Sequence, residues 1–345
     1  MSLKKYIFAP KKLKMDLTGK YQNSSEPEKK QRYLNWQAAK GLQAVDGIQT
    51  SAYLDQVAEK HIEGAISSYE ASKLIDSYYD VKEDRAAEAD SEEADKVAAR
   101  INIIIGEGGF SLSADELKGI HRRLFEGIFP FAGEFRTNNI IKHEWVLDGD
   151  TVTYGNAYSL ESAVDSALRA ERLTPFRQLD QEELVYHFAS FTAKLWRIHP
   201  FGEGNTRTTA VFLIKYLRSL GLEADNSLFE HHSLYFRNAL VRANYTNLKK
   251  GIYEDRGYLD DFFSDLISGT SHKFSNRLLH VYSSLLPKDV DGQILQMIKN
   301  NPSITRAEMA SRLNVSVKTI ERHLKSLPNV RYTGSAKSGE WKVES

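Results

Sequence analysis

The stretch that decides the fold is His199-Pro200-Phe201-Gly202-Glu203-Gly204-Asn205-Thr206-Arg207, which lies between two apolar helical patterns. A helix that begins near Asn205 presents unpaired backbone N–H groups and a partial positive charge, and together these attract anions. Gly202 and Gly204 allow a phosphate to approach the backbone closely. The stretch therefore predicts a phosphate-binding loop at the start of a helix.

The charged side chains of the stretch fit the same interpretation. Arg207 can hold phosphate oxygens in a bidentate contact. Glu203 offers the hard oxygen that Mg²⁺ accepts together with substrate phosphates. His199 belongs to the one residue type whose ordinary pKa lies near neutral pH, so it is the natural general base. These residues predict a nucleotide-phosphate site with a base beside it.

Composition limits the class of protein. The 345 residues correspond to about two domains at ~150 residues each. Lys plus Arg (46) equals Asp plus Glu (46), so the net charge indicates neither nucleic acid nor a membrane as a partner. The absence of cysteine excludes disulfides and thiolate metal sites. No apolar run approaches the ~20 residues that span a bilayer, and the basic N-terminus lacks a signal-peptide pattern, so we expect a cytoplasmic protein without a membrane partner.

Most of the chain shows helical periodicity. Residues 1–30 are polar and lysine-rich and predict an irregular arm. Helical patterns follow over residues 33–40, 51–63, 69–79, 83–105, 113–125, 158–172, 180–198, 205–220, 231–245 and 256–267. One segment departs from this helical periodicity, because residues 140–147 and 151–153 resemble two short strands around Asp148-Gly149-Asp150. The sequence thus predicts a helical body with one β-hairpin.

A second domain is predicted after Pro287. Three short helical patterns over residues 291–299, 305–313 and 316–327 precede two strand-like segments within residues 329–343, the pattern of a winged helix-turn-helix. The last helix has a polar and basic face suited to a DNA groove, and a lysine in the wing could reach phosphate. These residues are Lys318, Thr319, Arg322, His323, Lys325 and, in the wing, Lys337. The alternative uses of such a fold are contact with another protein and docking on the first domain of the same chain.

The motif resembles the signature of the Fic family, His-Pro-Phe-x-Asp/Glu-Gly-Asn-Gly-Arg-x-x-Arg. Residues 120–136 (IHRRLFEGIFPFAGEFR) and 235–244 (YFRNALVRAN) are similar to flanking segments of that family. The resemblance implies a mainly α fold, a Fic (Fido) helical bundle with a small β-hairpin flap. We expect N-terminal helices packed on the core over residues 1–109, the Fic domain over 110–270 and the winged helix over 285–345.

The resemblance also implies an activity, the transfer of AMP from Mg²⁺-ATP to a Ser, Thr or Tyr hydroxyl of a target protein. By position, His199 takes the hydroxyl proton and Glu203 holds Mg²⁺. The residues expected to contact the nucleotide are Gly202, Gly204, Asn205, Thr206, Arg207 and Asn244. The flap around Ile141 and Lys142 would pair with an extended segment of the target. The family further suggests a homodimer.

Two positions depart from the signature. Thr206 replaces the second glycine, which narrows the space near the phosphates, and Ala210 stands where the second arginine is expected. In many relatives a glutamate from a Ser/Thr-x-x-x-Glu-Gly/Asn helix pairs with that arginine. The nearest matches here, at Ser24, Ser219 and Glu59, are incomplete. We therefore expect the N-terminal helices to pack on the core without a glutamate–arginine pair.

Two other functions remain open from the sequence. A DNA-binding regulator could use the Fic core only to sense a nucleotide, because the departures at positions 206 and 210 are compatible with a slow or inactive site. A second enzymatic alternative is the transfer of a different phosphate moiety by the same fold.

Overall fold

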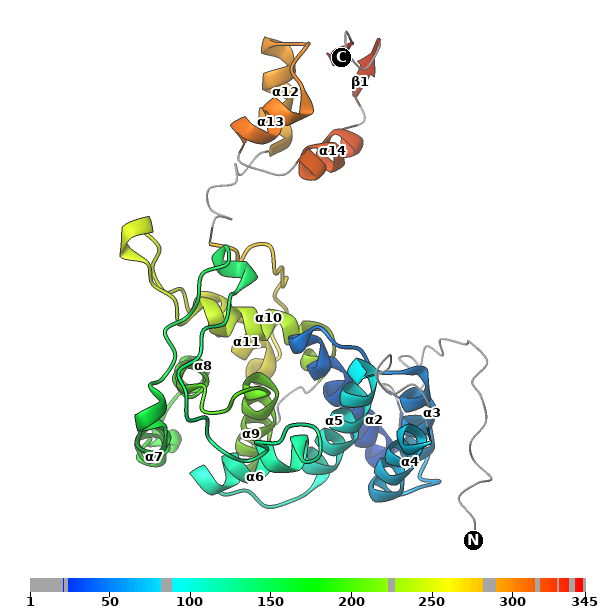
Figure 1. Cartoon of the computed structure of the whole chain (residues 1–345), viewed down its shortest axis with the longest axis vertical. Helices are drawn as coiled ribbons and strands as arrows, with labels where there is room; N and C mark the ends of the chain where they lie inside the picture. Colours follow the sequence, from blue (N-terminus) through cyan, green and yellow to red (C-terminus); the bar gives the residue numbers. More distant parts are fainter. Residues whose placement is uncertain are drawn as a thin grey trace. The chain divides into compact units, whose positions relative to one another are not determined.

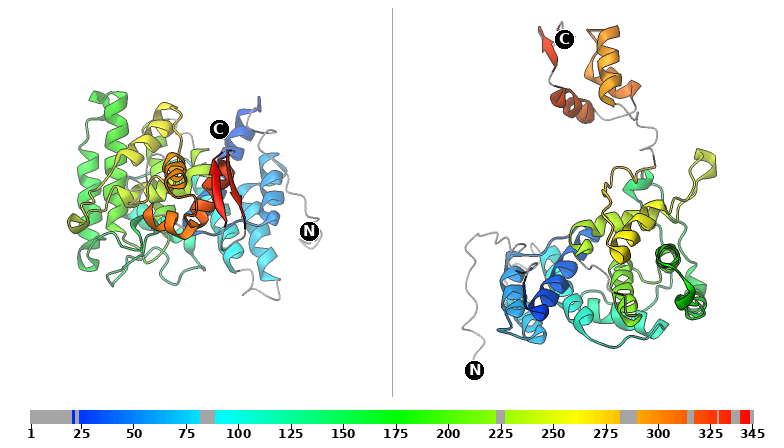
Figure 2. Two further views of the ribbon diagram at one scale, coloured as in Figure 1. Left: turned by 90° about the horizontal axis from the view of Figure 1, so that it is seen from above. Right: turned by 180° about the vertical axis from the view of Figure 1, so that it is seen from behind.

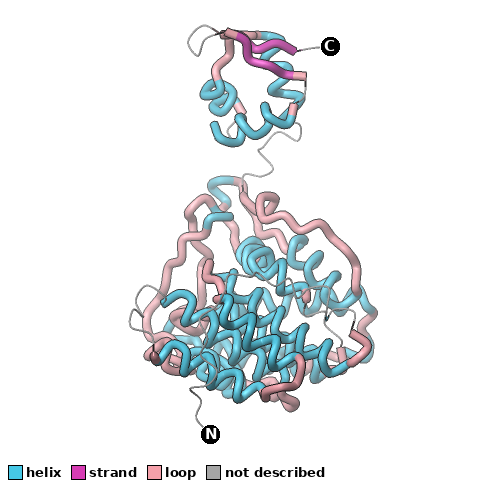
Figure 3. Tube along the Cα trace, turned by 90° about the vertical axis from the view of Figure 1, so that its right-hand side faces the viewer, coloured by secondary structure: helices cyan, strands magenta, loops and turns pink. Residues whose placement is uncertain are grey.

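The computed structural model describes residues 21, 24–81, 89–222, 227–281, 290–313, 317–327, 329–334 and 339–343. The chain divides into two compact units, Met1–Asn276 and Arg277–Ser345. The wing lysine at position 337 lies outside the described residues. Among the residues that are described, the fold is mainly α as predicted, and the named strands are two short ones in the smaller unit (Figures 1 and 3).

The larger unit is a bundle of helices at the positions of the periodic patterns, although the first begins at Pro27 instead of residue 33, and the helix start predicted at residue 83 lies outside the described residues. The helices are α2 (Pro27–Gly41), α3 (Ala52–Ile62), α4 (Ser68–Asp80), α5 (Ala89–Gly106), α6 (Ala114–Phe125), α7 (Leu160–Arg172), α8 (Gln181–Ile198), α9 (Asn205–Ser219), α10 (Leu228–Arg242) and α11 (Gly257–Ser268). The irregular arm predicted over residues 1–30 is too long, because α2 already begins at Pro27. Residues 1–20 lie outside the part of the chain that the structure describes.

Local sequence signals fix where several helices begin. The Ser67 side chain accepts a hydrogen bond from the backbone N–H of Glu70, and the Glu70 side chain accepts one from the backbone N–H of Ser67. The two bonds form a capping box at the start of α4. Asp180 and Glu183 form the same arrangement at α8, which leads to the motif. Each cap satisfies backbone donors that the first turn leaves unpaired, a contribution of about 1 kcal/mol.

Helix α9 is the central element, because every residue from its start to Leu217 is buried. It packs against α5, α6 and α8 (Figure 1). Lys215 of α9 donates to the carbonyl oxygens of Ile104 and Glu107 at 3.2 Å each, and Arg218 donates to that of Ile105. Cations at these unpaired carbonyls stabilise the C-terminal end of α5. The contacts fix α5 beside α9 and so bring the N-terminal half of α5 to the motif.

The N-terminal helices pack on the rest of the larger unit. Helix α2 contacts α5 and α10, and α4 contacts α5; the views in Figure 2 show these elements side by side. A 3₁₀ turn, η2 (Leu42–Asp46), follows α2 and contacts α9. This packing places residues of the first hundred positions next to a motif that begins at His199.

The predicted β-hairpin at residues 140–153 is wrong. Within this segment, which is fully described, Trp145–Leu147 forms a 3₁₀ turn (η3) and no strand is formed. The chain does reverse direction, since the backbone N–H of Glu144 donates to Asp150 O at 2.9 Å and that of Gly149 to Glu144 O at 3.0 Å. Hydrogen bonds to side chains take the place of a β-ladder beside this turn. For example, the backbone N–H of Lys142 donates to Thr151 Oγ1 at 3.3 Å. The segment, called the flap below, is therefore an anchored loop.

The smaller unit forms the predicted three helices and a β-ribbon. Its elements are α12 (Val290–Asn300), α13 (Arg306–Arg312), α14 (Val317–Ser326), β1 (Val330–Thr333) and β2 (Glu340–Val343), with the strands antiparallel. Ile294, Met309, Ile320 and Trp341 belong to its separate buried core. None of the helices in the described parts of the chain combines the length and apolar character that a bilayer crossing requires.

Candidate active site at the start of helix α9

His199 ends helix α8 in an unusual backbone conformation. Its φ of 51° and ψ of 58° are left-handed, which is rare for a residue with a Cβ and costs about 1–2 kcal/mol. Arg136 holds this turn, because its Nε donates to the carbonyl oxygen of His199 at 2.8 Å. Strain of this kind is kept where a surrounding structure fixes a functional side chain. The sequence did not point to Arg136 as a positioning residue.

The imidazole of His199 is buried and held in one tautomer. Its Nδ1 lies 3.3 Å from the carbonyl oxygen of Trp196, which can only accept, so Nδ1 carries the proton and Nε2 keeps its lone pair. Tyr154 packs against the ring at 4.3 Å between centroids. Burial, together with the positive charge of Lys142, holds the pKa of His199 well below its usual 6.5. The ring is therefore neutral near pH 7 and can accept a proton at Nε2.

Asn205 and Gly204 shape the loop between His199 and α9. Phe201 N–H donates to Asn205 Oδ1 at 2.9 Å, and Asn205 Nδ2 donates back to Phe201 O at 2.8 Å. Gly204 is left-handed, with a φ of 73°, and a Cβ on it would lie 2.4 Å from the ring of Phe125. Gly202 is less restricted, because its Cβ would lie 3.2 Å from Phe131. The predicted glycines and amide thus close a tight turn that opens α9.

Thr206 is bound to the protein itself. Trp196 Nε1–H donates to Thr206 Oγ1 at 3.0 Å, and both side chains are buried. The hydroxyl oxygen therefore tethers the start of α9 to the end of α8. Thr206 is among the residues expected to contact the nucleotide, and the structure gives its oxygen a donor within the protein.

Replacing Thr206 by Val is expected to lower the free energy of unfolding by about 1–3 kcal/mol, because the buried indole N–H of Trp196 loses its acceptor. Thr206→Ser keeps the oxygen and is the matched control. Urea denaturation of the three proteins measures the difference. Equal stability of the Val and Ser variants would show that the Trp196–Thr206 bond contributes nothing.

Glu203 faces outward and contacts the flap. Its side chain is 53% exposed, and Lys142 Nζ lies 2.6 Å from Glu203 Oε2. In the described parts of the chain, no three His, Asp or Glu side chains gather into a metal-binding group. A single carboxylate nevertheless fits Mg²⁺, which binds through one or two protein carboxylates when phosphates supply further oxygens. The Lys142 ammonium now neutralises the carboxylate that would hold the ion.

Arg207 is enclosed by acidic side chains from the N-terminal region. Its Nε lies 2.8 Å from Asp46 Oδ2 and its Nη2 lies 2.7 Å from Glu93 Oε1. Gln43 accepts a further bond from Nη1 at 3.1 Å, and the guanidinium packs on Phe125 at 4.8 Å. With 1% of the residue exposed, Arg207 can reach a phosphate only if these contacts are exchanged.

The glutamate–arginine pair of the relatives uses the second arginine of the signature and cannot form here, because Ala210 stands at that position. A different pair, which the sequence did not predict, joins the N-terminal helices to the core: Glu93 on α5 and Asp46 on η2 bind Arg207, the first arginine of the signature. Neither acid is the glutamate of the three near matches at Ser24, Ser219 and Glu59. Sequence spacing could not reveal it, because the partners are 114 and 161 positions from Arg207, and only the packing of α5 and η2 on α9 brings them together.

The flap is anchored to α10 and to the chain that follows it. Glu144 is 1% exposed and forms an ion pair with Arg237 at 2.7 Å. Tyr245 O–H donates to Asp150 Oδ2 at 2.7 Å, which contributes most to holding the pKa of Asp150 below its usual range. Ile141, three residues before the first of these anchors, is 72% exposed. The flap thus holds Lys142 over the motif and presents Ile141 to solvent.

Asn244 lies at the end of α10 and joins it to α8. Its Nδ2 donates to the carbonyl oxygens of Ala193 at 3.1 Å and Leu240 at 2.9 Å. The side chain is half-buried. Its amide nitrogen is therefore engaged with the protein, and its predicted contact with adenosine stays a prediction.

His121 is a further buried residue that the sequence did not single out. Its Nε2 lies 3.0 Å from Glu203 O, and its Nδ1 accepts from Gly133 N–H at 2.8 Å. Burial lowers the pKa of His121 to about 4. The residue touches the backbone of the motif while lying 82 positions before it.

Acidification is expected to destabilise the chain through His121. Between pH 6.5 and about 4, the unfolded chain binds a proton that the folded chain excludes, so stability falls as pH falls. This histidine contributes up to about 1.4 kcal/mol per pH unit in that window. Urea denaturation from about pH 7 to about pH 5 should give a steeper loss for the wild type than for His121→Phe. Parallel curves would contradict this assignment.

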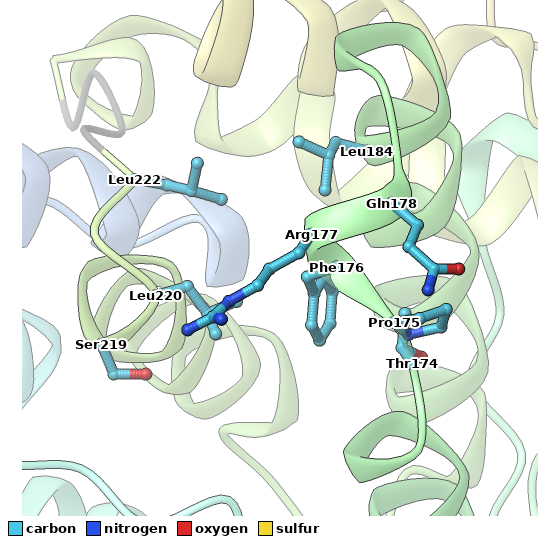
Figure 4. Close-up of a pocket in the computed structure, with 9 residues that line it drawn as sticks. All are labelled: Thr174, Pro175, Phe176, Arg177, Gln178, Leu184, Ser219, Leu220 and Leu222. Carbon is cyan, nitrogen blue, oxygen red and sulfur yellow. The ribbon is translucent and has the colours of Figure 1, made fainter.

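A separate pocket of about 720 Å³ lies away from the motif, between the α7–α8 connection and the end of α9 (Figure 4). Its lining residues are Thr174, Pro175, Phe176, Arg177, Gln178, Leu184, Ser219, Leu220 and Leu222. None of the predicted site residues is among them, so this cavity is not the site that the motif forms.

Two family models match separate stretches of the chain. Residues 111–217 match the Fic/DOC family, and residues 288–327 match the family described as winged helix-turn-helix DNA-binding. A solved Fic family protein from Desulfovibrio desulfuricans G20 is similar at 12% identity and a TM-score of 0.46, over 90% of this chain and 87% of that one.

Two curated proteins are similar in sequence. Protein adenylyltransferase VbhT of Bartonella schoenbuchensis is 29% identical over 152 residues, which are 40% of this chain and 30% of that protein. The probable protein adenylyltransferase y4lH of Sinorhizobium fredii is 30% identical over 129 residues, 36% of this chain and 62% of that protein. The chain thus matches less than two thirds of either relative. The chain therefore carries a domain that matches the Fic/DOC family at residues 111–217 and, after it, a winged helix-turn-helix domain.

Proposed function

We propose that the chain is a protein adenylyltransferase that transfers AMP from ATP to a Ser, Thr or Tyr hydroxyl of a target protein. One observation carries the proposal: the imidazole of His199, six positions before the first residue of α9, is neutral and directs Nδ1 at the Trp196 carbonyl oxygen, so Nε2 keeps its lone pair. The names of the two curated relatives support the same reaction.

In the proposed reaction, the target hydroxyl oxygen forms a bond to the α-phosphorus of ATP. The bond from that phosphorus to the oxygen bridging to the β-phosphate breaks, and pyrophosphate leaves. His199 Nε2 takes the hydroxyl proton, for which its lowered pKa leaves it unprotonated near pH 7. Such a reaction depends mainly on positioning and on neutralising charge, so a small set of residues is sufficient.

The phosphates would lie against the first N–H groups of α9, with Gly202, Gly204, Asn205 and Thr206 shaping the loop and Arg207 released from its acidic partners. Glu203 would hold Mg²⁺ after exchanging Lys142, and the ion would neutralise phosphate charge. Asn244 would contact the adenosine.

The flap would receive the target. Ile141 is exposed, and the backbone of residues 138–143 lies outside any sheet in the described structure. An extended target segment can pair with such a backbone and align its hydroxyl with His199. The two anchors at Glu144 and Asp150 keep the flap in place during this pairing.

The test uses ATP labelled at the α- or the γ-phosphorus, incubated with the full chain, Mg²⁺ and a protein extract. We expect α-label on protein, lost by at least a hundredfold in His199→Ala and retained in His187→Ala. His187 is a matched control because it lies on α8 and bonds to Glu171 instead of the motif. Label from the γ-position alone would indicate transfer of another phosphate moiety, and nucleotide binding without any label would indicate a sensor.

A second candidate function, DNA binding, rests on helix α14. Lys318, Arg322 and Lys325 are exposed on this helix, whereas Ile320 and Leu324 are buried. His323, predicted to lie on the basic face, instead has its Nδ1 within hydrogen-bond distance, 2.8 Å, of Asp291 Oδ1 on α12. The remaining basic face is the part of the unit that suits a major groove.

Replacing Arg322 by Ala is expected to weaken binding of the full chain to duplex DNA about tenfold, and to reduce the slope of log K against log salt by about 1 if the side chain contacts phosphate. Arg312→Ala, an exposed arginine on α13, is the control. Fluorescence anisotropy over a salt series measures both quantities. A wild type without salt-dependent DNA binding would favour the protein-docking alternative.

A further inference from the structure

His121 is a fully buried histidine on α6 that contacts the loop before α9. Its ring stacks on Phe201 at 3.8 Å between centroids and 12° between planes. Phe201 is itself bound to Asn205 through two hydrogen bonds. The imidazole therefore lies against the part of the loop whose shape the proposed nucleotide site requires.

The two ring nitrogens of His121 have different partners, and these decide the tautomer. Gly133 N–H donates to Nδ1 at 2.8 Å, so Nδ1 must keep its lone pair. Nε2 then carries the proton and donates to the carbonyl oxygen of Glu203 at 3.0 Å. A lowered pKa agrees with this neutral form. One side chain thus connects the turn at Gly133 to the peptide between Glu203 and Gly204.

This bond fixes the direction of the Glu203–Gly204 peptide. The peptide is trans, so its N–H points opposite to its C=O. With the carbonyl directed at α6, the Gly204 N–H points away from α6. The next N–H groups, at the start of α9, also lack partners within the helix. Successive N–H groups in such a turn form a concave site for an anion.

The alternative orientation of this peptide is accessible without His121. Gly204 is left-handed with a φ of 73°, and glycine tolerates the backbone changes that accompany rotation of the preceding peptide. A rotated peptide would direct the Glu203 carbonyl oxygen, instead of an N–H, towards the phosphates. An oxygen facing an anion is repulsive, whereas an N–H attracts it.

We propose that His121 is a positioning residue for the phosphates: its Nε2–H holds the Glu203 carbonyl so that the Gly204 N–H faces the triphosphate. The proposal rests on the proposed function, because it concerns the same nucleotide site. It assigns to α6 a role in binding that the motif residues do not supply.

The experiment compares two ligands, Mg²⁺-ATP and adenosine, by calorimetric titration of the full chain. In His121→Phe the ring still stacks on Phe201 but both hydrogen bonds are lost. We expect its ATP dissociation constant to rise at least tenfold while that for adenosine changes less than twofold. His121→Gln, which keeps a donor and an acceptor, should recover ATP binding to within about threefold of the wild type. His187→Phe is the control for loss of a histidine elsewhere.

If His121 were merely structural, its loss would weaken the binding of both ligands alike or of neither. An unchanged ratio of the ATP and adenosine dissociation constants in His121→Phe would therefore overturn this proposal alone. A wild type that bound neither ATP nor inorganic triphosphate would overturn the proposed function as well. Should His121→Phe fail to fold, the wild type decides by NMR. The Gly204 amide proton should shift downfield on saturation with ATP, and no shift there would overturn the proposal.

Discussion

Asp46→Asn and Glu93→Gln, combined in one chain, are expected to strengthen ATP binding about tenfold while lowering the melting temperature of the ligand-free protein. The two carboxylates now neutralise Arg207, which is 1% exposed. A buried cation without partners is costly, and the loss is about 1–3 kcal/mol here because both acids are themselves partly exposed. Phosphate oxygens can replace the lost partners of Arg207, so ATP binding restores the stabilisation that the ligand-free protein has lost.

Two readouts test this result on the same samples. Calorimetry gives the ATP dissociation constant, and thermal unfolding with and without ATP gives the ligand-induced shift, which should be larger in the double variant than in the wild type. Glu107→Gln is the matched control, because Glu107 follows α5 and pairs with Arg123 where both side chains are more than 40% exposed. That variant should change stability by less than about 1 kcal/mol. Weaker ATP binding in the double variant would show that Arg207 does not bind the phosphates.

Gly204→Ala is expected to lower the free energy of unfolding by about 2–5 kcal/mol and to abolish ATP binding. The left-handed backbone at position 204 costs about 1–2 kcal/mol for any residue with a Cβ. The added methyl would also lie 2.4 Å from the buried ring of Phe125, and such overpacking costs about 1–3 kcal/mol. Phe125 packs on Arg207, so a displaced ring would also disturb the proposed phosphate site.

Gly221→Ala separates the two contributions. Gly221 has a similar φ of 76°, but nothing lies within 4 Å of the position of its Cβ. We expect this control to lose only about 1–2 kcal/mol and to bind ATP as the wild type does. Urea denaturation and calorimetry measure the pair. Equal losses in both variants would mean that Phe125 moves aside freely and that the close packing at Gly204 has no energetic weight.

Arg207 illustrates how stability and binding can oppose each other in one residue. Its present partners stabilise the N-terminal region on the core, and the same contacts keep the guanidinium from a phosphate. Lys142 has the same relation to Glu203, since its ammonium neutralises the proposed metal ligand. Nucleotide binding at the proposed site would therefore require the exchange of two sets of ion pairs.

Much of the fold could be predicted because helices depend on local information. The 3.6-residue spacing of apolar side chains and the caps at Ser67 and Asp180 lie within a few residues of the helices that they define. The flap failed as a prediction for the opposite reason. Its alternating residues resemble strands, but the ion pair of Glu144 with Arg237 and the bond of Asp150 with Tyr245 join positions that are 93 and 95 residues apart. Long-range anchors overrode a local preference.

The sequence by itself determined the helical body, the winged C-terminal unit and the identity of the residues at the start of α9, because periodicity, caps and a contiguous motif are all read within a short window. Only the tertiary structure decided the state of those residues. It enclosed Arg207 between Asp46 and Glu93, placed Lys142 on Glu203 and brought His121 to the loop. Charge pairing and hydrogen bonding act over a few ångströms in space, whatever the distance along the chain, and packing alone sets which side chains come that close.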